Sequence, residues 1–321
     1  MTHDAVHANY IGRFAPSPTG PLHLGSLLTA VAAYLDCRAH HGRFLVRIED
    51  LDPAREIPGS DQTILTTLEL FGIEWDEPVV YQSQRRAYYQ EALDQLWQQQ
   101  LVYRCRCSRR FLREHATRGQ YGLIYPNTCR NLDVSATERH AVRVRVNNEP
   151  IDFTDPVFGT IQQRLEQDLG DFIVVRSDGW FAYQFAVVVD DALQHITHVV
   201  RGSDLFDSTP RQIYLQQCLH YPKLNYLHLP LIVKPDGIKL SKQTGAHGVT
   251  LDCPSRTLHH CLTLLGQNPP DELRHIELPA LWQWSVSHWH RENLTQHPIP
   301  VNDGPETTAE PPDAPPDTQD E

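Results

Sequence analysis

The sequence has no long apolar run. No stretch approaches the ~20 consecutive apolar residues that a bilayer-spanning helix needs, and residues 1–9 are polar, without the core of a secretory signal. Cysteine is scarce and odd in number, with seven among 321 residues. This argues against a disulfide framework and indicates a reducing compartment. We therefore expect a cytoplasmic protein without a membrane partner.

An excess of positive charge is also absent. The formal net charge is −12, and residues 303–321 hold seven acids, repeated prolines and no basic residue. Such a segment cannot bury enough apolar surface to fold, so we expect a disordered acidic tail over 298–321. The rest of the chain is still acidic, and a nucleic-acid partner would need a local basic patch. The candidates, which could equally form a solvated face, are Arg104, Arg106, Arg109, Arg110, Arg113, Arg118 and Arg130.

A strand gives way to a helix near the N-terminus. Residues 10–14 read as a buried strand, the prolines and Gly20 that follow interrupt it, and apolar residues recur at helical spacing from Leu24 to Leu35. We expect Pro21 in the first helical turn, where a missing N–H costs no hydrogen bond. The exposed N–H groups of this turn would form an anion site.

Two side chains add to that site. His23 would supply a further donor, and Gly25, like Gly20, would let a phosphate approach the backbone. By itself His23 is as readily a surface histidine. A second polar segment changes this balance: Lys239 and Lys242 follow a predicted strand over 227–233 and a turn over 235–237. Together the two segments can hold a triphosphate from both sides, although two lysines alone usually form a solvated run.

The remaining pattern predicts an α/β fold. Residues 44–48 read as a strand that ends in Glu49, Asp50 and Asp52, at the edge where parallel sheets bind ligands. Further strands are expected at 142–146, 172–175 and 196–200, and helices at 84–100, 184–193 and 255–266. Ser60 would cap a helix carrying Ile64 to Leu70, and a last helix would carry Leu281 to Trp289.

At 321 residues the chain exceeds the size of one core. We expect a Rossmann-like doubly wound parallel sheet, interrupted by an α+β zinc-containing insertion and followed by a small helical appendage. The predicted parts are a flexible N-terminus (1–9), the first half of the nucleotide-binding core (10–72), the insertion (73–176), the second half of the core (177–250), the helical appendage (251–297) and the tail (298–321).

Three cysteines cluster in the insertion. Cys105, Cys107 and Cys129 lie within 25 positions, and thiols so spaced in a reducing compartment favour a structural zinc site over a disulfide. Zinc needs a fourth ligand, and His115 is the choice on chemistry. The alternative is a set of reduced cysteines without metal. The other four, expected as small core residues, are Cys37, Cys218, Cys253 and Cys261.

Four ordered segments resemble the catalytic core of the class I glutamyl-tRNA synthetases. They are Phe14-Ala-Pro-Ser-Pro-Thr-Gly20, His23-Leu-Gly-Ser26, Arg47-Ile-Glu-Asp-Leu-Asp-Pro-Ala-Arg55 and Lys239-Leu-Ser-Lys242. The second and fourth correspond to the HIGH and KMSKS signatures of that class. Ser26, Leu240 and Gln243 depart from the usual letters, which should tune nucleotide affinity without removing the reaction. The resemblance covers about residues 10–250.

The resemblance implies a role for each matching residue. His23 and Lys242 would be catalytic, and the ATP-binding residues would be Pro16, Gly20, His23, Gly25, Ser26, Lys239 and Lys242. The glutamate-binding residues would be Arg13, Ser17, Glu49, Tyr183 and Arg201. Arginine suits a carboxylate because its planar fork donates two parallel hydrogen bonds. The related glutaminyl enzymes lack an arginine at the Arg201 position, which favours glutamate, although each residue could instead be structural. The zinc ligands would be Cys105, Cys107, Tyr125 and Cys129, with Tyr125 preferred to His115.

The length of the chain after the second lysine distinguishes between two families that share these motifs. Only 78 residues follow Gln243, too few for the helical region with which glutamyl-tRNA synthetases read the anticodon. The chain is thus more similar to the glutamyl-queuosine tRNA(Asp) synthetase family, which implies a monomer that activates L-glutamate with ATP and Mg²⁺ and esterifies queuosine in the tRNA(Asp) anticodon. The alternatives are a truncated synthetase charging the tRNA 3′ end, a nucleotidyltransferase acting on a free small molecule, and a non-catalytic zinc module that binds RNA.

Overall fold

A parallel sheet forms the centre of the molecule, seen in a computed structural model that describes residues 10–119, 121–240 and 248–301. β1 (Ile11–Phe14) pairs with β2 (Arg43–Ile48), which pairs with β3 (Val80–Tyr81). On the other side, the Thr197 amide donates to the Ile11 carbonyl (2.9 Å) and brings β11 (His198–Gly202) and its parallel partner β12 (Asn225–Leu229) beside β1. The strand order β3-β2-β1-β11-β12 reverses between β1 and β11, where open α/β sheets bind ligands.

Helices cover both faces of this sheet. Phe44, Val46 and Ile48 of β2 pack in one core with α1 (Leu24–Ala39), whereas Leu45 points into a second core with α6 (Tyr183–Leu193) and α7 (Thr209–Cys218). α2 (Ser60–Leu70) belongs to the first core and α3 (Arg86–Gln98) to the second. Burial on both faces explains why three consecutive apolar residues, Phe44 to Val46, occur in β2 without polar alternation.

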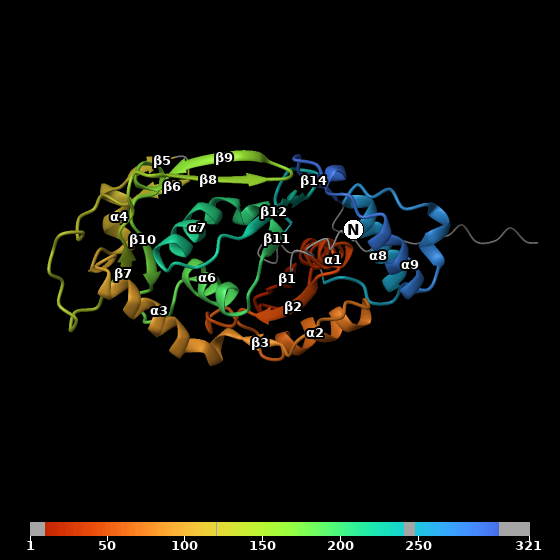
Figure 1. Cartoon of the computed structure of the whole chain (residues 1–321), viewed down its shortest axis with the longest axis horizontal. Helices are drawn as coiled ribbons and strands as arrows, with labels where there is room; N and C mark the ends of the chain where they lie inside the picture. The colour runs from red at the N-terminus through yellow and green to blue at the C-terminus, as the bar shows by residue number, and fades with distance from the viewer. Residues whose placement is uncertain (1–9, 120, 241–247, 302–321) are drawn as a thin grey trace, which may run out of the picture.

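The segment between β3 and α6 contains more strands than the pattern predicts. β4 (Val102–Cys105), β7 (Ala141–Val144) and β10 (Phe172–Val175) form an antiparallel sheet in the order β10-β7-β4. Two hairpins accompany it, β5 (Thr117–Gly119) with β6 (Gly122–Ile124) and β8 (Pro150–Asp155) with β9 (Gly159–Arg164), as do short helices α4 (Arg109–His115) and α5 (Leu165–Asp168). Figure 1 shows these elements at one end of the molecule, with the β8–β9 hairpin reaching back toward β14.

The C-terminal helices lie at the opposite end (Figure 1). α8 (Pro254–Leu264) and α9 (Leu278–Ser287) share the apolar core of α1. Asp36 of α1 anchors the residues after α9, because it accepts hydrogen bonds from Trp289 Nε1 (2.9 Å) and from Arg291 Nε and Nη2 (2.5 and 2.8 Å). Short 3₁₀ turns occur at Gln82–Arg85, Ser203–Ser208, Asp271–His275 and Arg291–Asn293. Within the described ranges, no helix has the length and apolar character to span a membrane.

Several predicted boundaries are wrong. The first helix begins at Leu24 with His23 as its N-cap, so Pro21 lies before it. Ser60 is not a cap: Gly59, with φ +78°, holds that position, and the Ser60 hydroxyl accepts from the Gly20 amide (2.6 Å) instead.

Two strands and one cysteine also differ from expectation. The strand predicted at 227–233 is two strands, because Pro230 interrupts β12 before β13 (Ile232–Val233), which pairs with β14 (Ile299–Pro300). The strand predicted at 196–200 lies two residues later as β11. Cys253 is exposed at the start of α8, whereas Cys37, Cys218 and Cys261 are buried as predicted.

Candidate active site

A cavity of 530 Å³ opens at the carboxyl ends of β1, β11 and β12. Its walls are the β1–α1 loop, the first turn of α1, the residues after β11 and the segment before Lys239. Nine of the residues predicted to bind ATP or glutamate line it: Arg13, Pro16, Ser17, His23, Gly25, Ser26, Tyr183, Arg201 and Lys239. Glu49 and Gly20 do not line it, and Lys242 lies outside the described residues.

The first turn of α1 is shaped by His23. His23 Nδ1 accepts from the Ser26 amide (3.3 Å), and the Ser26 hydroxyl accepts from the His23 amide (2.9 Å), which together form a capping box. Because Nδ1 accepts, the proton of the neutral ring resides on Nε2, which becomes a donor. A Cβ added at Gly25 would lie 3.2 Å from the His23 ring, so only glycine avoids pressing on it. The turn therefore combines helical N–H groups with an imidazole donor.

The chain before and after the predicted lysine loop returns to this turn. Leu240 lines the cavity, and its amide donates to the Ile232 carbonyl (2.8 Å). Gly248 forms a β-bridge with His23, and the Val249 amide donates to the Leu22 carbonyl (3.0 Å). The described residues on either side of 241–247 thus lie at this site, Leu240 in the cavity wall and Gly248 beside His23.

Lys239 forms a salt bridge with Asp204 in the wall of the cavity. Its ammonium lies 2.6 Å from Asp204 Oδ2, and both residues line the cavity. Asp204 is not among the predicted site residues, although its place three residues after Arg201, just beyond a predicted strand end, is a usable signal. Arg55, the last residue of the third motif, also lines the cavity and has no predicted role.

Arg201 is a buried cation without an acidic partner among the described residues. Its side-chain donors go to neutral acceptors: Nε to His228 Nε2 (3.3 Å), Nη1 to Gln212 Oε1 (2.8 Å) and Nη2 to Thr209 Oγ1 (2.7 Å). Arg201 is 3% exposed, so its charge is largely removed from water. An uncompensated buried charge is costly unless an opposite charge is supplied. The cavity is thus suited to an anion at this point.

A second group of buried charges lies behind Arg13. Arg13 Nε is 3.4 Å from Asp191 Oδ1, and Arg47 Nη2 is 2.8 Å from the same oxygen and 3.5 Å from Glu49 Oε1. Although burial opposes it, the positive charges of Arg13 and Arg47 hold the pKa of Asp191 below its ordinary value. Burial dominates at Glu49 and raises the pKa of that carboxyl to about 7. The pKa of the Tyr183 hydroxyl is raised, chiefly by burial and next by the negative charge of the nearby Glu49.

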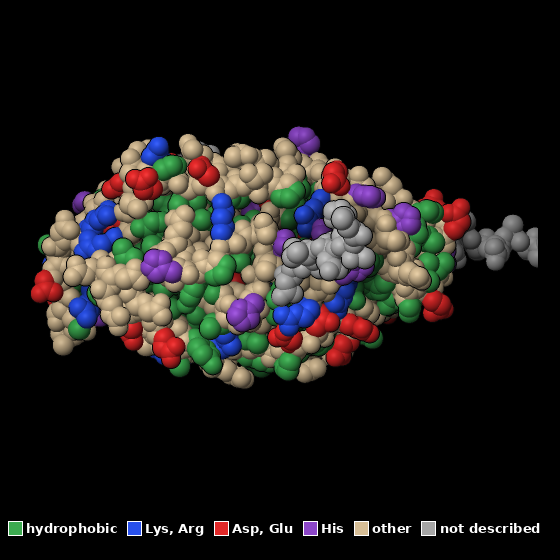
Figure 2. Space-filling view, viewed as in Figure 1, with side chains coloured by type: hydrophobic (Ala, Val, Ile, Leu, Met, Phe, Trp, Pro, Cys, Tyr) green, Lys and Arg blue, Asp and Glu red, His purple; other side chains and the backbone are tan. Residues whose placement is uncertain are grey.

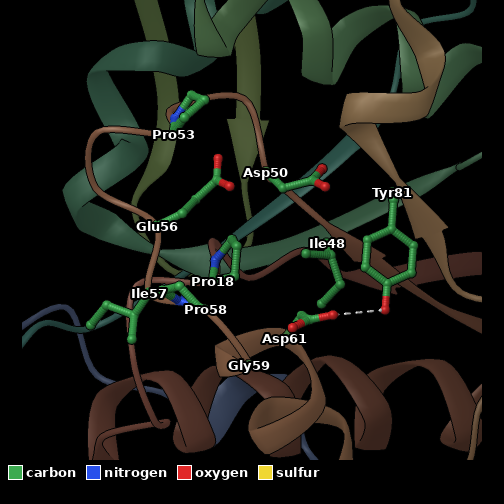
Figure 3. A pocket seen from close by; sticks show the side chains of 10 residues that line it. All are labelled: Pro18, Ile48, Asp50, Pro53, Glu56, Ile57, Pro58, Gly59, Asp61 and Tyr81. Atoms are coloured by element: carbon green, nitrogen blue, oxygen red, sulfur yellow. Dashed lines mark hydrogen bonds between the residues drawn. The ribbon is translucent and has the colours of Figure 1, made fainter.

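A smaller cavity of 330 Å³ lies on the other side of Pro18. Figure 3 shows the carboxylates of Asp50, Glu56 and Asp61 around it, with the Tyr81 hydroxyl donating to Asp61 (3.2 Å). Among the residues that the structure describes, no lysine, arginine or histidine lines this cavity. It is therefore unsuited to a triphosphate, and the larger cavity is the candidate nucleotide site.

The three insertion cysteines meet in space. The sulfurs of Cys105, Cys107 and Cys129 all lie within 4.8 Å of one another. The Tyr125 hydroxyl is 3.3 Å from Cys105 Sγ and 3.7 Å from Cys107 Sγ. His115 is instead exposed, with its ring stacked on Phe111 and Nδ1 bonded to the Phe111 carbonyl (3.0 Å). The donor set fits zinc, and the geometry favours Tyr125 over His115 as the fourth group.

Arginines of the predicted basic patch gather near these cysteines. Figure 2 shows basic side chains at the end of the molecule that carries α4. Arg109, Arg113 and Arg118 are exposed and have no acidic partner in the described part of the chain. Three other members are paired with acids: Arg106 with Glu138 (3.3 Å), Arg110 with Glu114 (2.9 Å) and Arg130 with Asp171 (3.3 Å). Only part of the predicted patch therefore carries uncompensated charge.

Comparison with known proteins is consistent with this geometry. A family model described as tRNA synthetases class I (E and Q), catalytic domain, matches residues 11–277. A glutamyl-Q tRNA(Asp) synthetase of Dechloromonas aromatica is 50% identical over 286 residues, which cover 88% of this chain and 95% of the relative. The enzyme of that name from Neisseria meningitidis serogroup B is 48% identical over 294 residues, covering 90% and 99%.

Solved structures agree. A glutamate tRNA ligase of Elizabethkingia meningosepticum, crystallised in complex with its amino acid, superposes with a TM-score of 0.76 at 25% identity, covering 92% of this chain and 67% of that one. The enzyme of Elizabethkingia anophelis gives a TM-score of 0.75 at the same identity. The chain has the class I tRNA synthetase fold and belongs to the glutamyl-Q tRNA(Asp) synthetase family.

Proposed function

We propose that this chain uses ATP to convert L-glutamate to glutamyl-adenylate and transfers glutamate to queuosine in the anticodon of tRNA(Asp). The observation that carries the proposal is the 530 Å³ cavity, which joins the α1 N-terminus, Lys239 and the carboxylate-binding candidates Arg13 and Arg201. The names of the similar proteins support the choice of queuosine as acceptor. Zinc and the roles of individual residues are part of the same proposal.

Glutamate recognition would rest on complementary charges. Arg201, whose buried charge has no acidic partner in the described chain, would bind the side-chain carboxylate through its planar fork. Glu49, which does not line the cavity, would attract the ammonium from behind the wall that Arg13, Ser17 and Tyr183 form. The α-carboxylate is then left to face the nucleotide.

Activation would require positioning and charge stabilisation rather than an enzyme nucleophile. An α-carboxylate oxygen attacks the α-phosphorus of ATP, the bond to the bridging oxygen breaks, and pyrophosphate leaves. The α1 N–H groups, His23 Nε2–H and Lys239, with Lys242 from outside the described residues, would stabilise the developing charge. ATP enters as its Mg²⁺ complex, in which the ion neutralises charge on the leaving pyrophosphate. A hydroxyl of the queuosine diol then attacks the glutamyl carbonyl and AMP leaves.

The test compares acceptors. Glutamate-dependent pyrophosphate exchange without tRNA should occur, and labelled glutamate should transfer to tRNA(Asp) that contains queuosine but not to the same tRNA with guanosine. Removing the 3′-terminal adenosine should leave transfer intact. If transfer of glutamate is lost when that adenosine is removed, the chain is instead a synthetase that charges the 3′ end. If pyrophosphate exchange depends on a substrate other than glutamate, the chain is a different nucleotidyltransferase.

Glu49 makes the reaction dependent on pH. Since its pKa is raised to about 7, Glu49 gains a proton below that pH and no longer attracts the ammonium. We expect kcat/KM for glutamate to fall about tenfold for each pH unit below 7, while KM for ATP stays constant. Pyrophosphate exchange between pH 5.5 and 8.5 measures this.

The matched variant is Glu49→Gln, which cannot titrate. Its kcat/KM should be low and flat across the same range. Calorimetry of glutamate binding at pH 6 in two buffers of different ionisation enthalpy should also show release of a proton in the wild type, since the bound ammonium favours the ionised carboxylate. A flat wild-type profile would remove Glu49 from the ammonium site.

The cysteine cluster predicts one structural zinc ion per chain. Elemental analysis should find it in the wild type, and Cys107→Ser should lose it and unfold at lower temperature, because metal-binding energy contributes to folding. Tyr125→Phe, which removes one oxygen, should weaken zinc affinity with less effect on the fold. Cys253→Ser is the control, since this exposed thiol lies outside the cluster and its loss should leave zinc content unchanged.

A further inference from the structure

A buried chain of groups connects the β8–β9 hairpin to Arg201. Asp155, the last residue of β8, lies 2.8 Å from His228 Nδ1, and both side chains are fully buried. The same carboxylate accepts from the His228 amide (2.9 Å) and from the Val157 and Phe158 amides (2.8 and 2.9 Å). Burial alone would raise the pKa of Asp155. The hydrogen bonds that its carboxylate accepts, of which the one from His228 has the largest effect, nevertheless keep this pKa below the ordinary value. Asp155 is therefore a fixed anion.

This anion sets the state of His228. Because Nδ1 donates to Asp155, the neutral ring presents the lone pair of Nε2. Nε2 lies 3.3 Å from Arg201 Nε and 3.0 Å from Thr209 Oγ1, so it accepts from both. Burial, followed by the charge of Arg201, lowers the pKa of His228 despite the opposing effect of Asp155. The imidazole is thus a neutral acceptor at neutral pH.

The consequence for Arg201 is that it is held without being neutralised. Its three partners use three of its five N–H groups and leave one on each terminal nitrogen for a ligand in the cavity that it lines. If the Asp155 carboxylate contacted Arg201 directly, it would hold the guanidinium as firmly as His228 does, but it would neutralise the positive charge. The His228 ring lies between the Asp155 carboxylate and the Arg201 guanidinium and keeps them apart.

We propose that His228, oriented by Asp155, is a positioning residue that fixes the Arg201 guanidinium through a neutral acceptor and so reserves its charge for the carboxylate of the substrate. The inference rests on the proposed role of Arg201 in binding glutamate. It also assigns a part in substrate recognition to the β8–β9 hairpin, which Figure 1 shows reaching from the insertion toward β14.

The test uses three substitutions at His228. Gln offers a neutral oxygen near the place of Nε2, Glu has the same shape with a negative charge, and Leu offers no acceptor. KM for glutamate, KM for ATP and kcat are measured by pyrophosphate exchange, with thermal unfolding as the check of folding. We expect KM for glutamate to rise less than about threefold in His228→Gln, about tenfold in His228→Leu and about thirtyfold or more in His228→Glu, with KM for ATP unchanged.

The matched Gln and Glu variants separate charge from structure. A residue with a purely structural role would change thermal stability and move both KM values together. Equal glutamate KM values in His228→Gln and His228→Glu would overturn the inference, as would a wild-type glutamate KM in His228→Leu. Should the Glu variant fail to fold, the comparison of Leu with Gln decides. A wild type that shows no glutamate-dependent exchange would instead refute the proposed function, which is a different result.

Discussion

Arg201→Met is expected to lower kcat/KM for glutamate by about 10³-fold in pyrophosphate exchange, because a buried charge pair is worth several kcal/mol when one partner is removed. Arg201 is 3% exposed and has only neutral partners in the described chain. The substrate carboxylate would then enter a water-poor pocket with no cation to receive it. Arg201→Lys should recover part of the loss, since it restores the charge but not the planar fork.

The neutral partners of Arg201 also predict that its removal has a small effect on folding. Removing Arg201 leaves a histidine, an amide and a hydroxyl, none of which is charged, so we expect the free energy of unfolding to fall by about 1–2 kcal/mol. Arg47→Met is the matched comparison. Arg47 Nη2 lies 2.8 Å from Asp191, and its Nε is 3.9 Å from Asp190, so its loss leaves buried carboxylates unpaired and should cost about 3–5 kcal/mol.

Denaturant titration of both variants checks this contrast. Arg201→Met should keep a midpoint near that of the wild type and lose activity, whereas Arg47→Met should unfold much earlier. Equal destabilisation of the two variants would mean that Arg201 serves the fold rather than the substrate, and a normal glutamate KM in Arg201→Met would lead to the same conclusion.

Local pattern and motif resemblance could predict where the site forms. Arg13 and Arg201 stand at or near the ends of apolar strands, and parallel strands present their carboxyl ends at one edge. His23 follows a Pro- and Gly-rich break between strand and helix. These signals depend on neighbours in sequence, and the structure gathers these three residues around one cavity.

The supporting contacts could not be predicted in that way. Asp155 reaches His228 across 73 positions, and an Asp before a proline reads only as a turn residue. Ser60 illustrates the same limit: it has the composition of a helix cap, yet its hydroxyl accepts from Gly20, 40 residues away, while Gly59 holds the cap position. Such pairings depend on how distant elements pack, which periodicity does not contain.

Two further differences from expectation have local causes in the sequence. Pro230 could have divided the predicted strand at 227–233, because proline has no N–H to donate to a central ladder. Cys253 lies between Asp252 and Pro254, which is typical of a helix start rather than of a core, and it begins a helix at the surface. The strands of the insertion are short. In β8 the buried Ile151 and Phe153 alternate with the exposed Asp152 and Thr154, but the pattern covers only these four residues before the buried Asp155 breaks it.

His23→Asn is expected to slow adenylate formation by about 10²-fold, the usual cost of removing one donor from a developing negative charge. His23 has two functions that this substitution separates. Its Nδ1 caps α1 by accepting from the Ser26 amide, and its Nε2–H is the donor that we propose for the phosphates. Asparagine is a good N-cap residue but has no group that reaches the place of Nε2.

His23→Ala is the matched variant because it loses both functions. The two variants should show similar rates in a single-turnover assay of adenylate formation, whereas the alanine variant should be less stable than the asparagine variant by about 1 kcal/mol. Glutamate affinity should change little in either, since His23 acts on the nucleotide. If His23→Asn kept the wild-type rate and only His23→Ala were slow, the histidine would act solely as a cap, and the charge stabilisation would have to come from the helix N–H groups and the lysines.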